Sequence, residues 1–202
     1  YGHVDLAPYS AGASTMRNAF VNYRGGAYSR AGTAFVEYSK QSYSATSSPP
    51  RLITYQFSNE QGYALEFGDH YMRVHANGAP VVLPVVAVTA ATNANPIVLT
   101  DGLGPTGLTA GQWVTFAGVS GMTELNSGTY IAIPLSPTTF TLQARLGNAI
   151  DSSTWGVFTG LVPGGGCFPI FELATPWAAS DLPLLKFTQS ADVMSFTHPL
   201  YP

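Results

Sequence analysis

Histidines are the first candidates for chemistry, because imidazole binds metals and transfers protons near neutral pH. His70 and His75 lie five positions apart, beside Asp69, in a stretch whose pattern predicts a hairpin. A metal site needs three or four convergent ligands, whereas residues 70 and 75 of one strand point to opposite faces of a sheet. His3 and His198 lie in loop-like sequence and have no evident partner. The histidines therefore predict neither a metal site nor a bound cofactor.

Nucleophiles and paired carboxylates give no clearer catalytic signal. Cys167, the single cysteine, has no histidine near it in sequence, and we expect a small buried side chain rather than a reactive thiol. Four carboxylates could serve glycoside hydrolysis, but nothing sets two of them apart, and we expect solvated faces for Glu60, Glu66, Asp69 and Asp181. No enzyme is therefore predicted. An unrecognised hydrolase would need clustered carboxylates or contact between Cys167 and a histidine.

Glycines and tryptophans complete the search for ligand sites. The run Gly164–Gly166 lacks the Lys-Ser/Thr of a phosphate-binding loop, and we interpret it as a flexible joint. Exposed tryptophans can stack on sugars, and the chain has Trp113, Trp155 and Trp177. Trp113 alternates with its neighbours in a strand-like stretch, so we expect it in a core. Carbohydrate binding stays open as an alternative function.

Arginines cluster once, near the start of the chain. Arg17, Arg24 and Arg30 lie within a short span that also contains Tyr23 and Tyr28. These arginines could pair with acidic groups of a partner subunit or approach nucleic acid inside a channel. A solvated surface explains them about as well.

Composition limits the partners that the chain can have. Of its 202 residues, 46% are hydrophobic and only 9% are charged, against about 25% in ordinary globular domains. A net charge of −3 gives no support for a general nucleic-acid or anionic-membrane partner. No apolar run is long enough for a membrane helix. The low charge favours burial against partners, and the absence of an initiating Met leads us to expect a segment of a longer protein.

Hydrophobic periodicity predicts a mainly β fold with one short N-terminal helix. The helix is expected within residues 1–24, where Ser10 can cap it, apolar residues recur at helical spacing up to Phe20 and Gly25–Gly26 end it. A strand pair is expected over 27–40. From Arg51 to His75 strict alternation predicts a three-stranded antiparallel meander, with one apolar and one mixed face and a tight turn at Gly68–Asp69.

A change of composition predicts an inserted module. Residues 76–166 contain four charged side chains and no lysine, and short strands are expected at 82–90, 96–100, 112–119, 128–134, 138–143 and 154–159. Short, regularly spaced strands are typical of a small barrel or sandwich. We therefore divide the chain into a discontinuous β-domain, residues 1–83 and 167–202, and an inserted β-module, residues 84–166.

The earlier pattern returns after the module. Residues 187–196 repeat the strand, turn and strand of residues 57–67, and a short helical turn is expected at Asp181 before Leu182. Two similar hairpins on either side of an insertion are what two blades of a propeller-like antiparallel β-domain would leave.

Residues outside the module resemble the N-terminal region of tail nozzle proteins, also called tail tubular protein B, of short-tailed bacteriophages and prophages. The stretches that carry the resemblance are Val4–Tyr9, Met16–Phe20, Gly25–Gly26, Arg30–Val36, Gln61–Asp69, Phe171–Trp177, Asp181–Val193 and His198–Pro199. They cover most of residues 1–80 and 168–202. Residues 84–163 are similar to an accessory β-module that is inserted in some members.

This resemblance implies a virion structural protein without enzymatic activity. It implies that copies form a ring, expected to be a hexamer, around a DNA-ejection channel, with the phage DNA in transient contact. The ring would dock to the tail adaptor and other tail proteins, with Arg17, Arg24 and Arg30 as possible partner contacts. The alternative is a receptor- or carbohydrate-binding β-protein of a phage tail or a cell surface.

Overall fold

The computed structural model describes residues 15–22, 26–40, 49–58 and 60–201. These residues form antiparallel sheets and two short 3₁₀ helices, which confirms the mainly β fold. The chain divides into two compact units, residues 1–35 and 36–202.

The first unit contains a two-stranded hairpin instead of the expected helix. Strands β1 (Ala19–Val21) and β2 (Ala27–Ser29) pair antiparallel, with Phe20 opposite Tyr28. The helix prediction is wrong for residues 15–20, which are loop and strand, and residues 10–14 lie outside the described residues. Asn18 has a φ of 54°, a left-handed conformation that a helix excludes. The strand pair expected over 27–40 is also wrong, because β2 pairs backwards with β1 and residues 30–39 form no strand.

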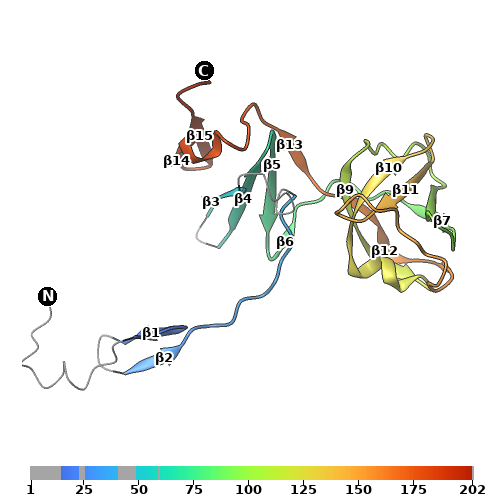
Figure 1. The fold of residues 1–202 in the computed structure, drawn as a ribbon, viewed down its shortest axis with the longest axis horizontal. Helices are drawn as coiled ribbons and strands as arrows, with labels where there is room; N and C mark the ends of the chain where they lie inside the picture. The colour runs from blue at the N-terminus through green and yellow to red at the C-terminus, as the bar shows by residue number, and fades with distance from the viewer. Residues whose placement is uncertain (1–14, 23–25, 41–48, 59, 202) are drawn as a thin grey trace, which may run out of the picture. The chain divides into compact units, whose positions relative to one another are not determined.

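The second unit begins with the expected meander (Figure 1). Strands β3 (Arg51–Gln56), β4 (Gly62–Gly68) and β5 (Tyr71–Ala76) pair in sequence order, and β13 (Glu172–Ala174) adds to the far side of β5. A two-residue strand, β6 (Ala79–Pro80), also pairs with β5. The tight turn between β4 and β5 is confirmed, and His70 there has a φ of 58°. His70 is thus a turn residue and does not belong to the strand that carries His75.

One face of this sheet packs on the C-terminal hairpin. Ile53, Leu65 and Phe67 are buried on the sheet side. Helix η2 (Leu182–Leu184) and strands β14 (Lys186–Ser190) and β15 (Val193–Thr197) cover them, with Phe196 edge-on to Phe67 at 5.1 Å between ring centroids. The expected hairpin over 187–196 is confirmed, and the helical turn expected before Leu182 lies slightly later, at Leu182–Leu184. The relation of the two hairpins to propeller blades stays a prediction.

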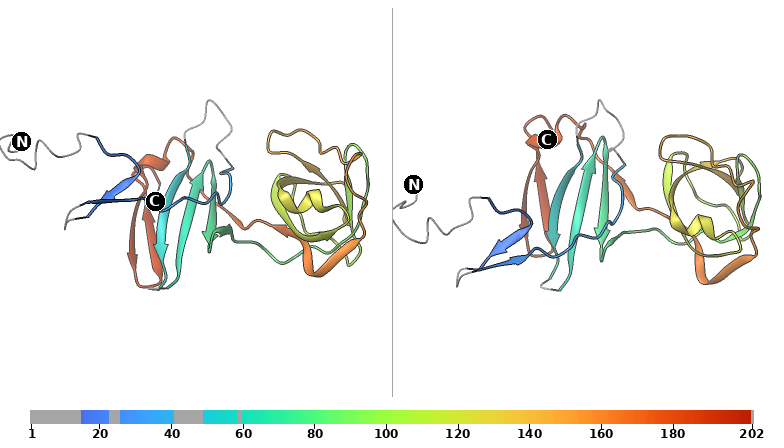
Figure 2. Two further views of the ribbon diagram at one scale, coloured as in Figure 1. Left: turned by 90° about the horizontal axis from the view of Figure 1, so that it is seen from below. Right: turned by 60° about the horizontal axis from the view of Figure 1, so that its bottom comes forward.

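Residues between the two parts of this sheet form a six-stranded, nearly closed barrel (Figure 2). Its strands lie in the order β12 (Gly160–Pro169), β9 (Gln112–Ser120), β10 (Thr129–Pro134), β11 (Thr139–Gln143), β8 (Val98–Asp101) and β7 (Val88–Ala91). Helix η1 (Thr123–Ser127) follows β9. Backbone hydrogen bonds of 2.7 and 3.0 Å between Val86 and Cys167 join its two edges. The barrel has its own apolar core, which includes Leu99, Phe140 and Leu142.

The barrel corrects two details of the sequence interpretation. The strand expected at 154–159 is absent, and β12 follows it instead, with Gly164–Gly166 inside the strand. These glycines are not a joint: a Cβ atom at Gly165 would lie 2.8 Å from the carbonyl oxygen of Ala117. They let β12 lie close against β9 at a β-bulge.

Two segments connect the barrel to the five-stranded sheet, and they run side by side. Val82 bridges to Ile170, and the amide of Leu83 donates to the carbonyl of Pro169 at 2.7 Å. We call residues 81–86 and 167–171 the stalk. The expected module boundaries, 84 and 166, fall within or beside the stalk and stay a prediction.

Candidate functional site

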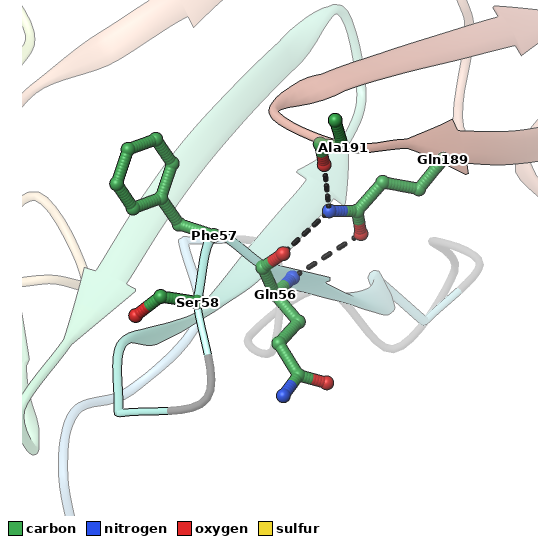
Figure 3. Close-up of a pocket in the computed structure, with 5 residues that line it drawn as sticks. All are labelled: Gln56, Phe57, Ser58, Gln189 and Ala191. Carbon is green, nitrogen blue, oxygen red and sulfur yellow. Dashed lines mark hydrogen bonds between the residues drawn. The ribbon is translucent and has the colours of Figure 1, made fainter.

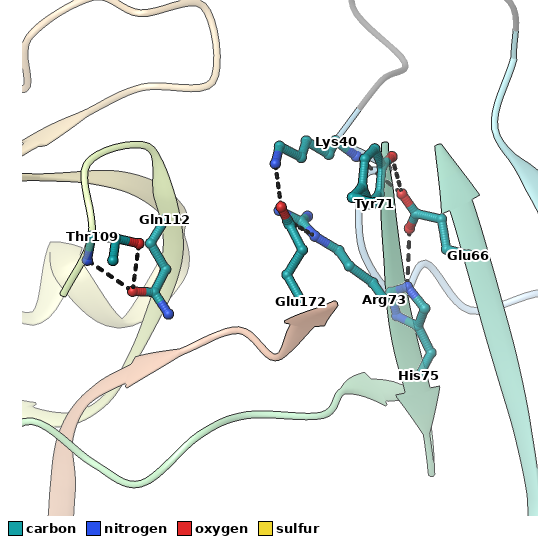
Figure 4. A network of polar contacts seen from close by, with 8 residues as sticks. All are labelled: Lys40, Glu66, Tyr71, Arg73, His75, Thr109, Gln112 and Glu172. Carbon is teal, nitrogen blue, oxygen red and sulfur yellow. Dashed lines mark hydrogen bonds and ion pairs between the residues drawn. The ribbon is translucent and has the colours of Figure 1, made fainter. Parts of the chain in front are cut away.

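The second face of the five-stranded sheet carries a cluster of charged and polar side chains (Figure 4). The register places Glu66 opposite Arg73 and Arg73 opposite Glu172, across β4, β5 and β13. His75 lies two residues further along β5, on the same face. This alternation explains the mixed face that the sequence predicts. We call these four residues, with Tyr71 and Lys40, the polar network.

Glu66 is the centre of the network and is only 2% exposed. Its carboxylate accepts hydrogen bonds from the Tyr71 hydroxyl at 2.7 Å and from the Lys40 backbone amide at 3.2 Å, and it pairs with His75 Nε2 at 3.0 Å. Burial by itself raises the pKa of Glu66. The bonds from His75 and Tyr71, the charge of Arg73 and the Lys40 amide together hold that pKa below its ordinary value. The expected solvated position of Glu66 is therefore wrong.

Arg73 joins the sheet to the barrel. Its side chain is 1% exposed and forms an ion pair with Glu172 at 2.9 Å. Its guanidinium lies 4.4 Å from the ring centroid of Trp113, at the start of β9. A desolvated cation against an indole face contributes about 2 kcal/mol. This contact confirms that Trp113 is buried, and gives it a role that the sequence did not indicate.

Lys40 connects the chain segment that precedes the sheet to the polar network. Its ammonium pairs with Glu172 and lies 5.0 Å from the ring centroid of Tyr71. Close by in sequence, Glu37 accepts a hydrogen bond of 2.9 Å from the hydroxyl of Thr129 in the barrel. Residues 36–40 therefore contact both the sheet and the barrel, and we call them the strap.

A cavity of about 420 Å³ lies beside the network. The strap, β3, β4 and β5 line it with mainly apolar side chains, and Glu66 and His75 form its polar end. The second ring nitrogen of His75, Nδ1, is buried and has no hydrogen-bond partner within the described part of the chain. The Glu66 carboxylate already has three hydrogen-bond partners, and Ser39 also lines the cavity. Through these partners Glu66 links β4 to β5 and to the strap.

Other candidate residues lie apart from the network. Cys167 is fully buried, as expected, and burial together with the charge of Asp101 raises the pKa of its thiol well above the ordinary value. His198 is buried too and contacts the carbonyl of Asp181 at 3.1 Å. A hydrogen bond from the Tyr201 hydroxyl lowers the pKa of Asp181. Among the residues that the structure describes, no three His, Cys, Asp or Glu side chains converge on a metal position.

The remaining tryptophans do not form an exposed platform for sugars. Trp155 packs partly buried against the barrel core, and Trp177 packs edge-on against Phe67 and at a tilt against Phe196. Glu60 and Asp69 are exposed, as expected.

Arg17 and Arg30 lie exposed at one end of the N-terminal hairpin. The amide of Arg30 donates to the carbonyl of Asn18 at 2.9 Å, which sets the two arginines on facing chains. Arg24 lies outside the described residues, so the structure brings together two members of the expected cluster.

Comparison with known proteins adds no relative. No family model matches this sequence, and no curated protein has a significantly similar sequence. Within the described ranges, no helix is long and apolar enough to cross a membrane.

Proposed function

We propose that this chain is a structural segment of a phage tail nozzle, in which six copies form a ring around the DNA-ejection channel. The ring docks to the tail adaptor and neighbouring tail proteins, resides in the virion and contacts DNA only as it passes. The polar network and the strap hold the sheet and the barrel of each subunit together, and no step of the proposed function requires catalysis.

The observation that carries this proposal is the exposed apolar surface of residues 15–36. Phe20, Val21, Tyr28 and Phe35 are each at least half exposed, at 50%, 71%, 58% and 70%. A two-stranded hairpin is marginally stable on its own in water. Clustered exposed apolar side chains mark association sites. The resemblance of residues 16–20 and 30–36 to nozzle proteins supports the same surface as a subunit contact.

Mass photometry and negative-stain electron microscopy over a range of concentrations test the proposal. We expect the chain to form closed rings, and the double variant Phe20→Ser/Tyr28→Ser to shift the population to monomers at least tenfold. Leu103→Ser/Leu146→Ser is the matched control, because both leucines are exposed on barrel loops, at 83% and 62%. A wild-type chain that stays monomeric and binds glycans on an array would refute the proposal.

A further inference from the structure

We propose that the N-terminal hairpin of one copy docks on a polar pocket at two hairpin tips of a second copy. The pocket has a volume of about 420 Å³ and is lined by Gln56, Phe57, Ser58, Gln189 and Ala191 (Figure 3). It lies where β3 ends and where β14 turns into β15. This inference rests on the proposed self-assembly and assigns its contact surface.

Gln189 builds the pocket by fixing the two tips together. Its side-chain amide accepts from the backbone N–H of Gln56 at 3.2 Å and donates to the carbonyl oxygen of the same residue. The amide thus pairs with the edge of β3 as a neighbouring strand would. A further bond of 2.8 Å to the carbonyl of Ala191 closes the tip of the C-terminal hairpin. The receptor surface is therefore preformed, which lowers the entropic cost of binding.

Two carboxylates next in sequence to the pocket lining have no partner among the residues that the structure describes. Residues 36–202 contain ten Asp and Glu side chains. Eight of them accept a hydrogen bond or form an ion pair within the described residues: Glu37, Glu66, Asp69, Asp101, Glu124, Asp151, Glu172 and Asp181. The exceptions are Glu60, two residues after Ser58, and Asp192, next to Ala191, and both are exposed.

The N-terminal hairpin carries positive charge, which is opposite to the charge of Glu60 and Asp192. Residues 1–35 contain three arginines and one aspartate, a net charge of +2, whereas residues 36–202 contain five basic and ten acidic residues, a net charge of −5. Arg17 and Arg30 are exposed at the same end of the hairpin. Attraction between these two arginines and the two carboxylates would select the surface on which the hairpin docks and fix its orientation there.

Apolar contacts complete the match. Phe20 and Tyr28 form an aromatic pair, with ring centroids 5.7 Å apart, on the same hairpin. Phe57 lines the pocket and Val193 follows Asp192 in sequence, and the two side chains are 53% and 61% exposed. Aromatic anchors with arginines at their rim are the usual centre of a protein interface. Because the two surfaces differ, the contact is head-to-tail, which is the type of contact that a cyclic ring uses when the rotation between neighbours closes.

Charge reversal tests the contact on the full chain. We expect the hairpin variant Arg17→Glu/Arg30→Glu and the tip variant Glu60→Lys/Asp192→Lys each to weaken self-association at least tenfold in analytical ultracentrifugation at low salt. The variant with all four substitutions should regain association, since its reversed charges again match. An equimolar mixture of the hairpin and tip variants should also regain association, with the two variants alternating, because native hairpins then meet native tips and reversed hairpins meet reversed tips. Asp151→Lys, at an exposed carboxylate of the barrel, raises the net charge by half as much as the tip variant does and should leave self-association unchanged.

Each other outcome overturns the docking contact. Rings that form equally well from both double variants refute the docking contact and leave the proposed ring standing. A wild-type chain that stays monomeric at every concentration refutes both. Hairpin reversal that abolishes binding to double-stranded DNA but leaves self-association unchanged assigns the arginines to nucleic acid instead. A monomer whose hairpin becomes sensitive to trypsin only in the tip variant shows docking on its own chain.

Discussion

Replacement of Glu66 by alanine should destabilise the second unit by about 3–5 kcal/mol, the cost of removing one partner from a buried ion pair. The magnitude follows from the hydrogen bonds and the neighbouring charge that the Glu66 carboxylate would lose. It receives bonds from Tyr71, from His75 and from the Lys40 amide, and it faces the 1% exposed Arg73. A hydrogen bond to a charged group contributes about 1.5–3 kcal/mol, and the three are too close to be additive. Arg73 keeps Glu172, which limits the loss.

Urea denaturation followed by tryptophan fluorescence measures this change. We expect a lower midpoint for Glu66→Ala with an unchanged slope, and a smaller loss for Glu66→Gln, which keeps an acceptor. Glu60→Ala is the control, because Glu60 is exposed and its carboxylate has no partner in the described structure; it should cost less than about 0.5 kcal/mol. A loss below about 1 kcal/mol for Glu66→Ala would show that the network does not hold the sheet, the strap and the barrel together.

The same network predicts the pH dependence of stability. The pKa of Glu66 is lower in the folded chain than its ordinary value of 4.5. Its contribution is therefore fully present above about pH 4.5 and is lost as the pH falls through the folded-state pKa. The stability difference between wild type and Glu66→Gln should shrink below that pH. A difference that stays constant from pH 7 to pH 3 would contradict the ionised, hydrogen-bonded state of Glu66.

Three further predictions concern the barrel. Gly121→Ala should destabilise the barrel by about 3 kcal/mol or more, since φ is +79° and the new Cβ would lie 1.9 Å from a backbone oxygen. Gly147→Ala is the control in the same denaturation assay. Its φ is +85° but its surroundings are open, so it should cost only about 1–2 kcal/mol. Asn126→Ala should cost about 2 kcal/mol, because its amide satisfies both the N–H and the C=O of one β9 residue at 3.0 and 2.8 Å; an unchanged midpoint would contradict this. Cys167 should react with a thiol reagent about 100-fold more slowly in the native chain than in denaturant, and equal rates would show that it is exposed.

Local patterns were sufficient for the meander and most of the barrel. From Arg51 to His75 the apolar residues alternate, and the turn residues Gly68–Asp69 interrupt the alternation, so strand bounds and faces follow from the sequence. The N-terminal helix prediction failed for a physical reason. Met16, Ala19 and Phe20 recur at helical spacing by coincidence, while Phe20 and Val21 pair across the hairpin with residues beyond the next turn.

The network was beyond prediction because its burial depends on distant segments. The alternation places Glu66 on the mixed face of the sheet, but it contains no information on what covers that face. The cover is the strap, about 26 residues earlier, and Trp113 from the barrel. The burial of Glu66 and Arg73 is a property of the tertiary fold. The signal in the sequence that could have indicated the network was one acidic residue opposite one basic residue on neighbouring predicted strands.

The paired segments of the stalk determine how much sequence can be inserted or removed between them. Val82 bridges to Ile170 and Leu83 bonds to Pro169, so the two segments of the stalk pair like the strands of a hairpin. The whole barrel then takes the place of the turn that would connect them. The entropy of closing a loop grows only with the logarithm of its length, so roughly 80 intervening residues cost the sheet only about 2.5 kcal/mol more than a short turn does. A descendant chain that lost the barrel could therefore keep the pairing of the stalk, but it would have to replace Trp113 as the cover over Arg73.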